Sequence, residues 1–188
     1  MKLILASSSP RRRELLSRLG IQFDVVEPQV EEFHSPDPEE TVRKMAEIKA
    51  KEVFERINEQ DVMVIGSDTI VFFKSKILGK PKDIEEARKF LEELSGNWHE
   101  VFTAVSFAHT FGQETFVSRT RVKFRDLPKE LIELYVSEFK PLDKAGAYGI
   151  QDLGAVFVEK IEGDFYTVMG FPVGVVWEYL YKKGWWKP

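Results

Sequence analysis

The sequence predicts an α/β fold built on a mixed sheet. Short apolar runs typical of strands alternate with amphipathic helical segments, and the connections between them are short. Some neighbouring strands are close enough to form hairpins while others are separated by helices, so antiparallel and parallel pairs are both expected. Of the 188 residues, 43% are hydrophobic, enough for a single domain over 1–188 with an adequate core. We expect a central cleft in this domain.

The chain opens with a strand followed by a helix. Lys2–Ala6 is a short apolar strand. The helix after it is bounded by Ser9 as N-cap, Pro10 at the first helical position and Gly20 just past the end.

The first turn of this helix is unusually basic. Arg11, Arg12 and Arg13 stand where the positive end of the helix dipole favours acidic side chains. Backbone N–H groups, serine hydroxyls such as that of Ser7, and guanidinium groups after a strand together form a phosphate cradle. The segment therefore predicts an anion site, and a solvated basic face or a weak nucleic-acid patch is the alternative.

The remaining elements follow from caps and periodicity. Pro38 opens a long helix, and Asp83 with Glu86 forms a capping-box pair that opens another. Apolar residues alternate with polar ones in two later runs, as in half-buried strands. The expected helices are 38–57, 83–94, 128–139 and 172–182; the expected strands are 23–26, 62–65 continuing through 66–69 into 70–73, 77–78, 101–107, 116–124 and 155–161; and 142–153 is a glycine-rich loop.

Asp68 lies between two apolar runs, 62–65 and 70–73. An ionised carboxylate is costly there unless it is paired or bound to a metal. Gly66 and Ser67 before it indicate a bend or a close backbone approach. A turn between two short strands explains Asp68 equally well; the functional interpretation is a general base or a cation ligand.

Lys49 falls on the apolar stripe of the helix 38–57, four residues after Met45 and four before Val53. The neighbouring Lys51 lies off this stripe and is expected in solvent. A lysine on an inward face either extends its ammonium group to solvent or enters a cleft and meets phosphate.

Weaker candidates lie in loops. Glu31 and Glu32 are carboxylates of the kind that bind Mg²⁺ together with substrate phosphates. Lys80 follows a strand end. Gln151 offers the donor and acceptor that complement a uracil or thymine edge.

Composition and missing motifs exclude several classes. The formal net charge of -4 argues against nucleic acid as the partner. With Cys 0, disulfides and cysteine-ligated zinc are excluded, which fits the cytoplasm. The apolar run after Lys2 is too short for a signal peptide, and we expect no membrane span. Walker A and Gly-x-Gly-x-x-Gly motifs are absent, and the histidines lack metal-ligand spacing.

Taken in order, these segments resemble the Maf family of nucleotide pyrophosphatases over nearly the whole chain. The matching segments are 6–12 (ASSSPRR), 31–32 (EE), 49–50 (KA), 66–69 (GSDT), 79–81 (GKP), 94–96 (LSG), 143–151 (DKAGAYGIQ) and 168–172 (VMGFP). The resemblance implies two α/β lobes around a central cleft, as in inosine-triphosphate pyrophosphatases (the Maf/Ham1-like fold). It also implies hydrolysis of a nucleoside triphosphate to monophosphate and pyrophosphate with Mg²⁺ or Mn²⁺, often by a homodimer.

Roles follow by position in the motifs. Asp68 resembles the family's catalytic acid and Glu32 a cation ligand. The residues that resemble the phosphate-binding set are Ser7, Arg12, Lys49 and Lys80. The residues that resemble the positions linked to the choice of base are Arg11, Thr69 and Gln151.

The base-choice residues match the branch acting on dTTP and UTP rather than the sister branch acting on 7-methyl-GTP. Asp152 departs from the family pattern, in which glycine is expected. The charged side chain of Asp152, beside Gln151, either loosens base specificity or points to solvent.

Two alternatives stay open. One is the same chemistry on 7-methyl-GTP or other modified nucleotides. The other is a non-catalytic nucleotide-binding module that inhibits septum formation, although Asp68 between apolar runs would be a needless cost in such a module.

Overall fold

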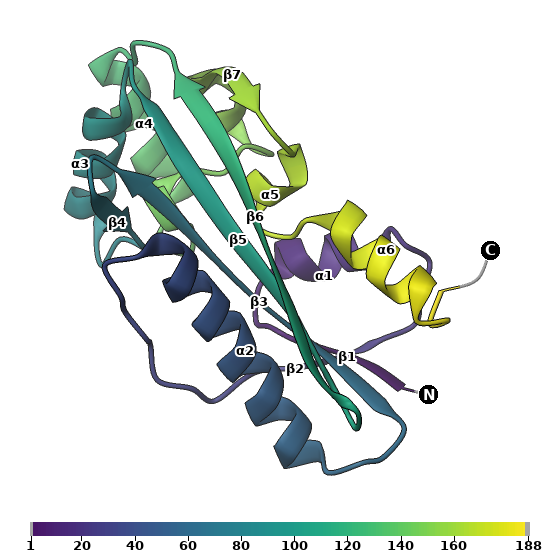
Figure 1. Ribbon diagram of the computed structural model, residues 1–188. Coiled ribbons are helices and arrows are strands. Elements are labelled where there is room, and N and C mark those ends of the chain that lie inside the picture. Colours follow the sequence, from purple (N-terminus) through teal and green to yellow (C-terminus); the bar gives the residue numbers. More distant parts are fainter. Residues whose placement is uncertain (1, 187–188) are drawn as a thin grey trace. The chain divides into compact units, whose positions relative to one another are not determined.

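The computed structural model describes residues 2–186 and confirms an α/β architecture with one mixed sheet (Figure 1). The strands are β1 (Lys2–Ala6), β2 (Asp24–Val26), β3 (Val62–Phe73), β4 (Lys76–Leu78), β5 (Trp98–His109), β6 (Gly112–Phe124) and β7 (Val158–Glu162). The helices are α1 (Pro10–Ser17), α2 (Pro38–Ile57), α3 (Ile84–Leu94), α4 (Lys129–Phe139), α5 (Phe165–Met169) and α6 (Val173–Lys182), with 3₁₀ helices η1 (Ala145–Ala147) and η2 (Leu153–Phe157). The strand order is β2-β1-β3-β5-β6-β7, and β4 pairs with β3.

The chain divides into two compact units. The first comprises residues up to 68, 103–118 and those from 170 on, and the second comprises 69–102 and 119–169. β3, β5 and β6 each contribute to both units. The predicted single domain over 1–188 and the central cleft stay predictions.

In the first unit, β1 pairs in parallel with β2 and with β3. Parallel neighbours require crossover connections, which α1 and α2 supply. α2 packs on one face of these strands, where Ala50 joins a core cluster with Ala108 of β5. The adjacent Phe107 stacks on Tyr179 of α6 with ring centroids 3.8 Å apart. Because consecutive strand residues face opposite ways, α2 and α6 cover opposite faces (Figure 1).

α2 is fixed by its caps and by a close approach to β3. The Asp37 side chain accepts a hydrogen bond from Glu39 N at the start, and Asn58 ends the helix in the left-handed conformation. A Cβ on Gly66 would lie 2.4 Å from Ala46 O and 2.6 Å from Ala50 N. The predicted close backbone approach at Gly66 is therefore confirmed.

In the second unit, β4 forms an antiparallel hairpin with β3, and β7 pairs antiparallel with β6. Helix α3 starts with the predicted capping-box-like pair: Asp83 accepts from Glu86 N, and Glu86 accepts from Lys82 N, one residue before the N-cap. α3 and α4 are joined by a bidentate ion pair between Arg88 and Glu133, with N–O distances of 2.6 and 2.9 Å.

Two interpretations need correction, and one helix was not predicted. Asp68 lies inside β3, which runs unbroken through Val62–Phe73, so the expected continuation of the strand is confirmed and the alternative, a turn between two strands, is wrong. Residues 155–157, expected to begin the strand 155–161, belong instead to η2, because the Asp152 side chain accepts from Gly154 N and caps a 3₁₀ turn. α5 was not predicted; the Asp164 carboxylate accepts from Thr167 N at 2.6 Å and initiates it.

Among residues 2–186, no helix combines the length and apolarity needed to cross a membrane.

Candidate functional site

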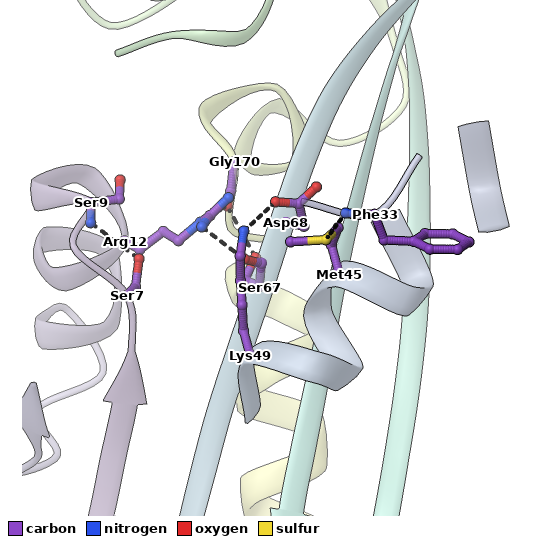
Figure 2. A network of polar contacts seen from close by, with 9 residues as sticks. All are labelled: Ser7, Ser9, Arg12, Phe33, Met45, Lys49, Ser67, Asp68 and Gly170. Atoms are coloured by element: carbon purple, nitrogen blue, oxygen red, sulfur yellow. Dashed lines mark hydrogen bonds and ion pairs between the residues drawn. The ribbon is translucent and has the colours of Figure 1, made fainter. Parts of the chain in front are cut away.

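The centre of the candidate site is an ion pair between Lys49 of α2 and Asp68 of β3. Lys49 Nζ lies 2.6 Å from Asp68 Oδ1, and each side chain is only 14% exposed (Figure 2). Both residues belong to the first unit. Of the two interpretations of Lys49, its extension into solvent is wrong. Lys51, by contrast, is 64% exposed, as predicted.

The ion pair depends on the contact between α2 and β3. Gly66 lets the helix backbone approach the strand, and Lys49 lies one residue before Ala50, which Gly66 contacts. The stem of Lys49 then reaches along the strand to the carboxylate two residues after Gly66. A partly buried carboxylate beside an ammonium group has the balanced charge that such a position requires.

Arg12 of α1 reaches the same middle part of β3. Its Nε donates to Gly170 O at 2.9 Å and its Nη1 donates to Ser67 O at 2.8 Å (Figure 2). Burial lowers the pKa of Arg12 to about 10, although the negative charge of Asp68 acts in the opposite direction and raises this pKa. The guanidinium group therefore connects α1, β3 and the segment before α6, close enough to Asp68 for its charge to act on the guanidinium.

The serine segment between β1 and α1 folds back on itself. The buried Ser7 hydroxyl oxygen accepts a hydrogen bond from Ser9 N at 3.1 Å. Ser9 is the N-cap residue and Pro10 follows at the first helical position, as predicted, and the first turn contains no acidic residue. Arg11 is half-buried and Arg13 is exposed. The basic start of α1 thus lies in the first unit with Asp68.

The segment 31–33 is attached to α2 one turn before Lys49. Phe33 N donates to Met45 Sδ at 3.0 Å (Figure 2), which places Glu32 next to this part of the helix with an exposed side chain. Among residues 2–186, no group of three histidine or acidic side chains is arranged to hold a metal ion. Mg²⁺ needs only one or two carboxylates when phosphates and water complete its shell. The donor set of Asp68 and Glu32 fits that requirement.

The other predicted site residues belong to the second unit. Thr69 follows Asp68 in β3 and is half-buried. Lys80 is exposed just after β4, and Gln151 is exposed just before η2. Gly146 N donates to Gly79 O at 3.1 Å, which joins the segment of Lys80 to the loop that leads to Gln151.

Asp152 points into the second unit. Its Oδ1 accepts from Tyr135 Oη at 2.9 Å and from Gly154 N at 2.8 Å. Its side chain is 20% exposed, so the expectation that it points to solvent is wrong. The sequence indicated neither Tyr135 nor Gly170 as a contact of the candidate site residues. Tyr135 lies within the expected helix 128–139 and binds Asp152 through its phenol oxygen, whereas Gly170 binds Arg12 through its backbone carbonyl.

Solved structures provide the first comparison. The fold is similar to that of a HAM1 protein from Coxiella burnetii, with a TM-score of 0.54 over 97% of this chain and 99% of that one, at 17% sequence identity. A likeness at this identity defines the class of fold only, and it confirms the predicted fold class.

Sequence comparison identifies the family. The family model described as Maf-like protein matches residues 2–183. A dTTP/UTP pyrophosphatase of Thermotoga maritima is 57% identical over 187 residues, covering 100% of this chain and 92% of the relative. A dTTP/UTP pyrophosphatase of Thermosipho melanesiensis is 47% identical over 184 residues, covering 97% and 98%. The chain therefore belongs to the Maf-like family.

Proposed function

We propose that the protein hydrolyses dTTP and UTP to the monophosphate and pyrophosphate. The substrates are those in the names of its relatives, which share up to 57% identity over essentially the whole chain. The structural observation that carries the proposal is the Lys49–Asp68 pair at 2.6 Å, beside the basic start of α1. In this arrangement the cationic groups can bind a polyphosphate, and the shielded carboxylate beside them can act on the water that attacks it.

In this proposal the phosphates bind to Ser7, Arg12, Lys49 and Lys80. Lys49 has one anionic partner in the described structure, and an ammonium group has three donors, so it can bind Asp68 and a phosphate oxygen together. Arg12 contributes positive charge while its Nε and Nη1 hold backbone carbonyls. The serine segment adds backbone N–H groups at a helix start.

A divalent cation, Mg²⁺ or Mn²⁺, is part of the proposal. Glu32 and Asp68 are the residues that would hold it. When bound, it would neutralise charge that develops on the leaving pyrophosphate. Two roles fit Asp68: it accepts the proton of the attacking water, or it serves as the cation ligand. A general base typically contributes about 10²–10⁴-fold to the rate.

Base selection is assigned to Arg11, Thr69 and Gln151. The exposed Gln151 amide offers a donor and an acceptor to a pyrimidine edge. A base that leaves such groups unpaired on binding is rejected. The cytoplasm, a homodimer and a role in septum formation stay predictions.

A substrate panel tests this function. The purified protein is incubated with dTTP, UTP, CTP, GTP and 7-methyl-GTP, with Mg²⁺ or Mn²⁺ and with EDTA, and the products are separated. We expect monophosphate and pyrophosphate from dTTP and UTP, and no turnover with EDTA. Pyrophosphate released mainly from another nucleotide would move the specificity to the alternative substrates. Free orthophosphate as the first product would contradict α–β cleavage, and binding without turnover would favour the non-catalytic module.

A further inference from the structure

The loop that leads to Gln151 has a strained backbone that must be held by its surroundings. Ala147 has a φ of 61°, a left-handed conformation that is uncommon for a residue with a Cβ. Two contacts fix the first half of the loop: Gly146 N donates to Gly79 O at 3.1 Å, and Tyr148 Oη lies 2.8 Å from His99 Nε2. Neither of these contacts reaches the residues next to Gln151.

A buried phenol fixes the second half of the loop from both sides of Gln151. Tyr135 Oη accepts a hydrogen bond from Gly149 N at 2.9 Å and donates one to Asp152 Oδ1 at 2.9 Å. Burial raises the pKa of Tyr135 above its ordinary value, so the phenol keeps the proton that it donates. The backbone two residues before Gln151 and the side chain one residue after it are thus bound to the same oxygen.

Asp152 extends this arrangement into η2. The same Oδ1 accepts from Gly154 N at 2.8 Å, and Lys144 Nζ lies 3.9 Å from Oδ2. The space is closely filled, because a Cβ on Gly149 would lie 2.5 Å from Asp152 Oδ2. With Tyr135 fully buried in α4, the network connects the loop to a rigid helix rather than to another loop.

We propose that Tyr135 and Asp152 are positioning residues that hold Gln151 in the orientation needed to select the base. The inference rests on the proposed function for its consequence in catalysis, but not for the loop order itself. A hydrogen-bonding side chain discriminates between bases only if its donor and acceptor are preorganised. Asp152 therefore sharpens base selection rather than loosening it.

Three variants and one control test the proposal. Asp152→Ala removes the acceptor, Asp152→Asn keeps a carbonyl oxygen in its place, and Tyr135→Phe removes the shared phenol oxygen. Asp83→Ala is the matched control, because Asp83 caps α3 by accepting from Glu86 N at 2.8 Å in the same unit. For each protein, kcat/KM is measured for dTTP and CTP, amide hydrogen exchange is followed over 144–157, and Tm is recorded.

The proposal expects a specific pattern. In Asp152→Ala and Tyr135→Phe, the dTTP-to-CTP ratio of kcat/KM falls about tenfold or more, and amide exchange over 144–157 accelerates. Asp152→Asn stays near wild type in both measurements. Asp83→Ala lowers Tm without changing either one. A merely structural role for Asp152 would instead lower Tm and the activity on both nucleotides alike.

Each remaining outcome contradicts one claim: the role in base selection, the positioning of the loop, or the proposed function. An unchanged dTTP-to-CTP ratio in both Asp152→Ala and Tyr135→Phe overturns the role in base selection. Unchanged amide exchange in those variants overturns the positioning itself. If the wild-type protein turns over no triphosphate, the proposed function fails, and amide exchange alone decides whether Tyr135 and Asp152 hold the loop.

Discussion

At the scale of single residues, partial burial gives the Lys49–Asp68 pair its character. Both side chains are 14% exposed and their charged atoms are 2.6 Å apart. Their attraction exceeds that of a surface pair, but the cost of removing both charges from water offsets much of it. A well-packed apolar pair would give similar or greater stability, so the pair is better explained by binding or chemistry than by folding.

Replacing Asp68 by asparagine tests its role in chemistry. The amide keeps the shape of the side chain but loses the negative charge, so the group can no longer accept a proton effectively. We expect kcat to fall by about 10²–10⁴-fold while nucleotide binding is largely retained. Turnover and calorimetric titration with dTTP provide the two measurements. Asp61→Asn is the control, because Asp61 is an exposed carboxylate just before β3. A folded Asp68→Asn protein with wild-type kcat would remove Asp68 from the mechanism.

Replacing Lys49 by methionine tests whether removing one charge of the pair costs more stability than removing both. The methionine fills similar space but leaves the Asp68 carboxylate without its ammonium partner. We expect the free energy of unfolding to fall by about 1–3 kcal/mol. Adding Asp68→Asn to this background should restore part of that loss, because the unpaired charge is then gone. Urea denaturation of the single and double variants measures both effects.

The control for Lys49→Met is Lys51→Met on the same helix. Lys51 is 64% exposed and 3.7 Å from Glu55, a pair of the kind that contributes little. Its substitution should change the free energy of unfolding by less than about 0.5 kcal/mol. Additive effects of Lys49→Met and Asp68→Asn would show that the two charges are energetically independent.

At the scale of elements, the candidate site exists because α1 and α2 both contact the middle of β3. Arg12 of α1 binds the Ser67 carbonyl, and Lys49 of α2 binds the next residue, Asp68. Gly66 makes the second contact possible, because any side chain there would collide with the α2 backbone. Three consecutive residues of β3 therefore have distinct parts: Gly66 sets the distance to α2, Ser67 accepts a hydrogen bond from Arg12 of α1, and Asp68 carries the carboxylate that pairs with Lys49.

Substituting Gly66 by alanine should disturb this contact. The new Cβ would lie 2.4 Å from Ala46 O and 2.6 Å from Ala50 N, so the helix or the strand must shift. We expect the free energy of unfolding to fall by about 1–3 kcal/mol. Because Lys49 moves with the helix, the turnover rate should fall by a larger fraction than the free energy of unfolding. The control is Gly174→Ala in α6, where an added Cβ meets nothing within 4 Å. Equal stability of the two variants would contradict the close approach.

At the scale of the whole molecule, local signals predicted more than tertiary ones. Signals with a clear chemical basis, such as the Asp83 cap and Pro10 at the first helical position, predicted the starts of helices. The sequence left a turn at Asp68 open as an alternative to a continuous strand, because pairing partners are not visible in local sequence; β3 in fact pairs with β1 up to Gly66 and with β4 from Val71. η2 was missed because alternating apolar residues do not distinguish a strand from a capped 3₁₀ turn.

The candidate site shows the same limit. Asp68 and Lys49 were each conspicuous as charges on apolar faces, but nothing in the sequence indicated that they bind each other. Arg12 was expected to bind phosphate, whereas its described hydrogen bonds go to two backbone carbonyls, which no side-chain pattern encodes. Tyr135 was predicted only as part of the helix 128–139, and the position of its phenol oxygen between two loop groups is a tertiary contact that no local pattern indicates.

The stability of the whole chain should depend on pH through the buried His99. Its Nε2 is 2.8 Å from Tyr148 Oη, and its Nδ1 has no hydrogen-bond partner within residues 2–186. Burial lowers the pKa of His99 from 6.5 to about 3. Below pH 6.5 the unfolded chain therefore binds a proton that the folded protein excludes, and stability falls as the pH falls towards 3. Above pH 6.5 both states are neutral at this residue and it contributes no pH dependence.

The variant His99→Gln isolates this contribution, because glutamine offers Tyr148 a hydrogen-bond partner but does not titrate. Each pH unit between the two pKa values corresponds to about 1.4 kcal/mol, so the wild type should lose about 2–3 kcal/mol more than the variant between pH 7.5 and 4.5. Urea denaturation at both pH values measures the difference. The exposed His34, changed to glutamine, is the control and should leave the pH dependence of the wild type unchanged. Identical acid sensitivity of the wild type and His99→Gln would mean that His99 accepts its proton in the folded protein, and that the second unit admits water to a ring that its aromatic neighbours Phe124 and Tyr148 enclose.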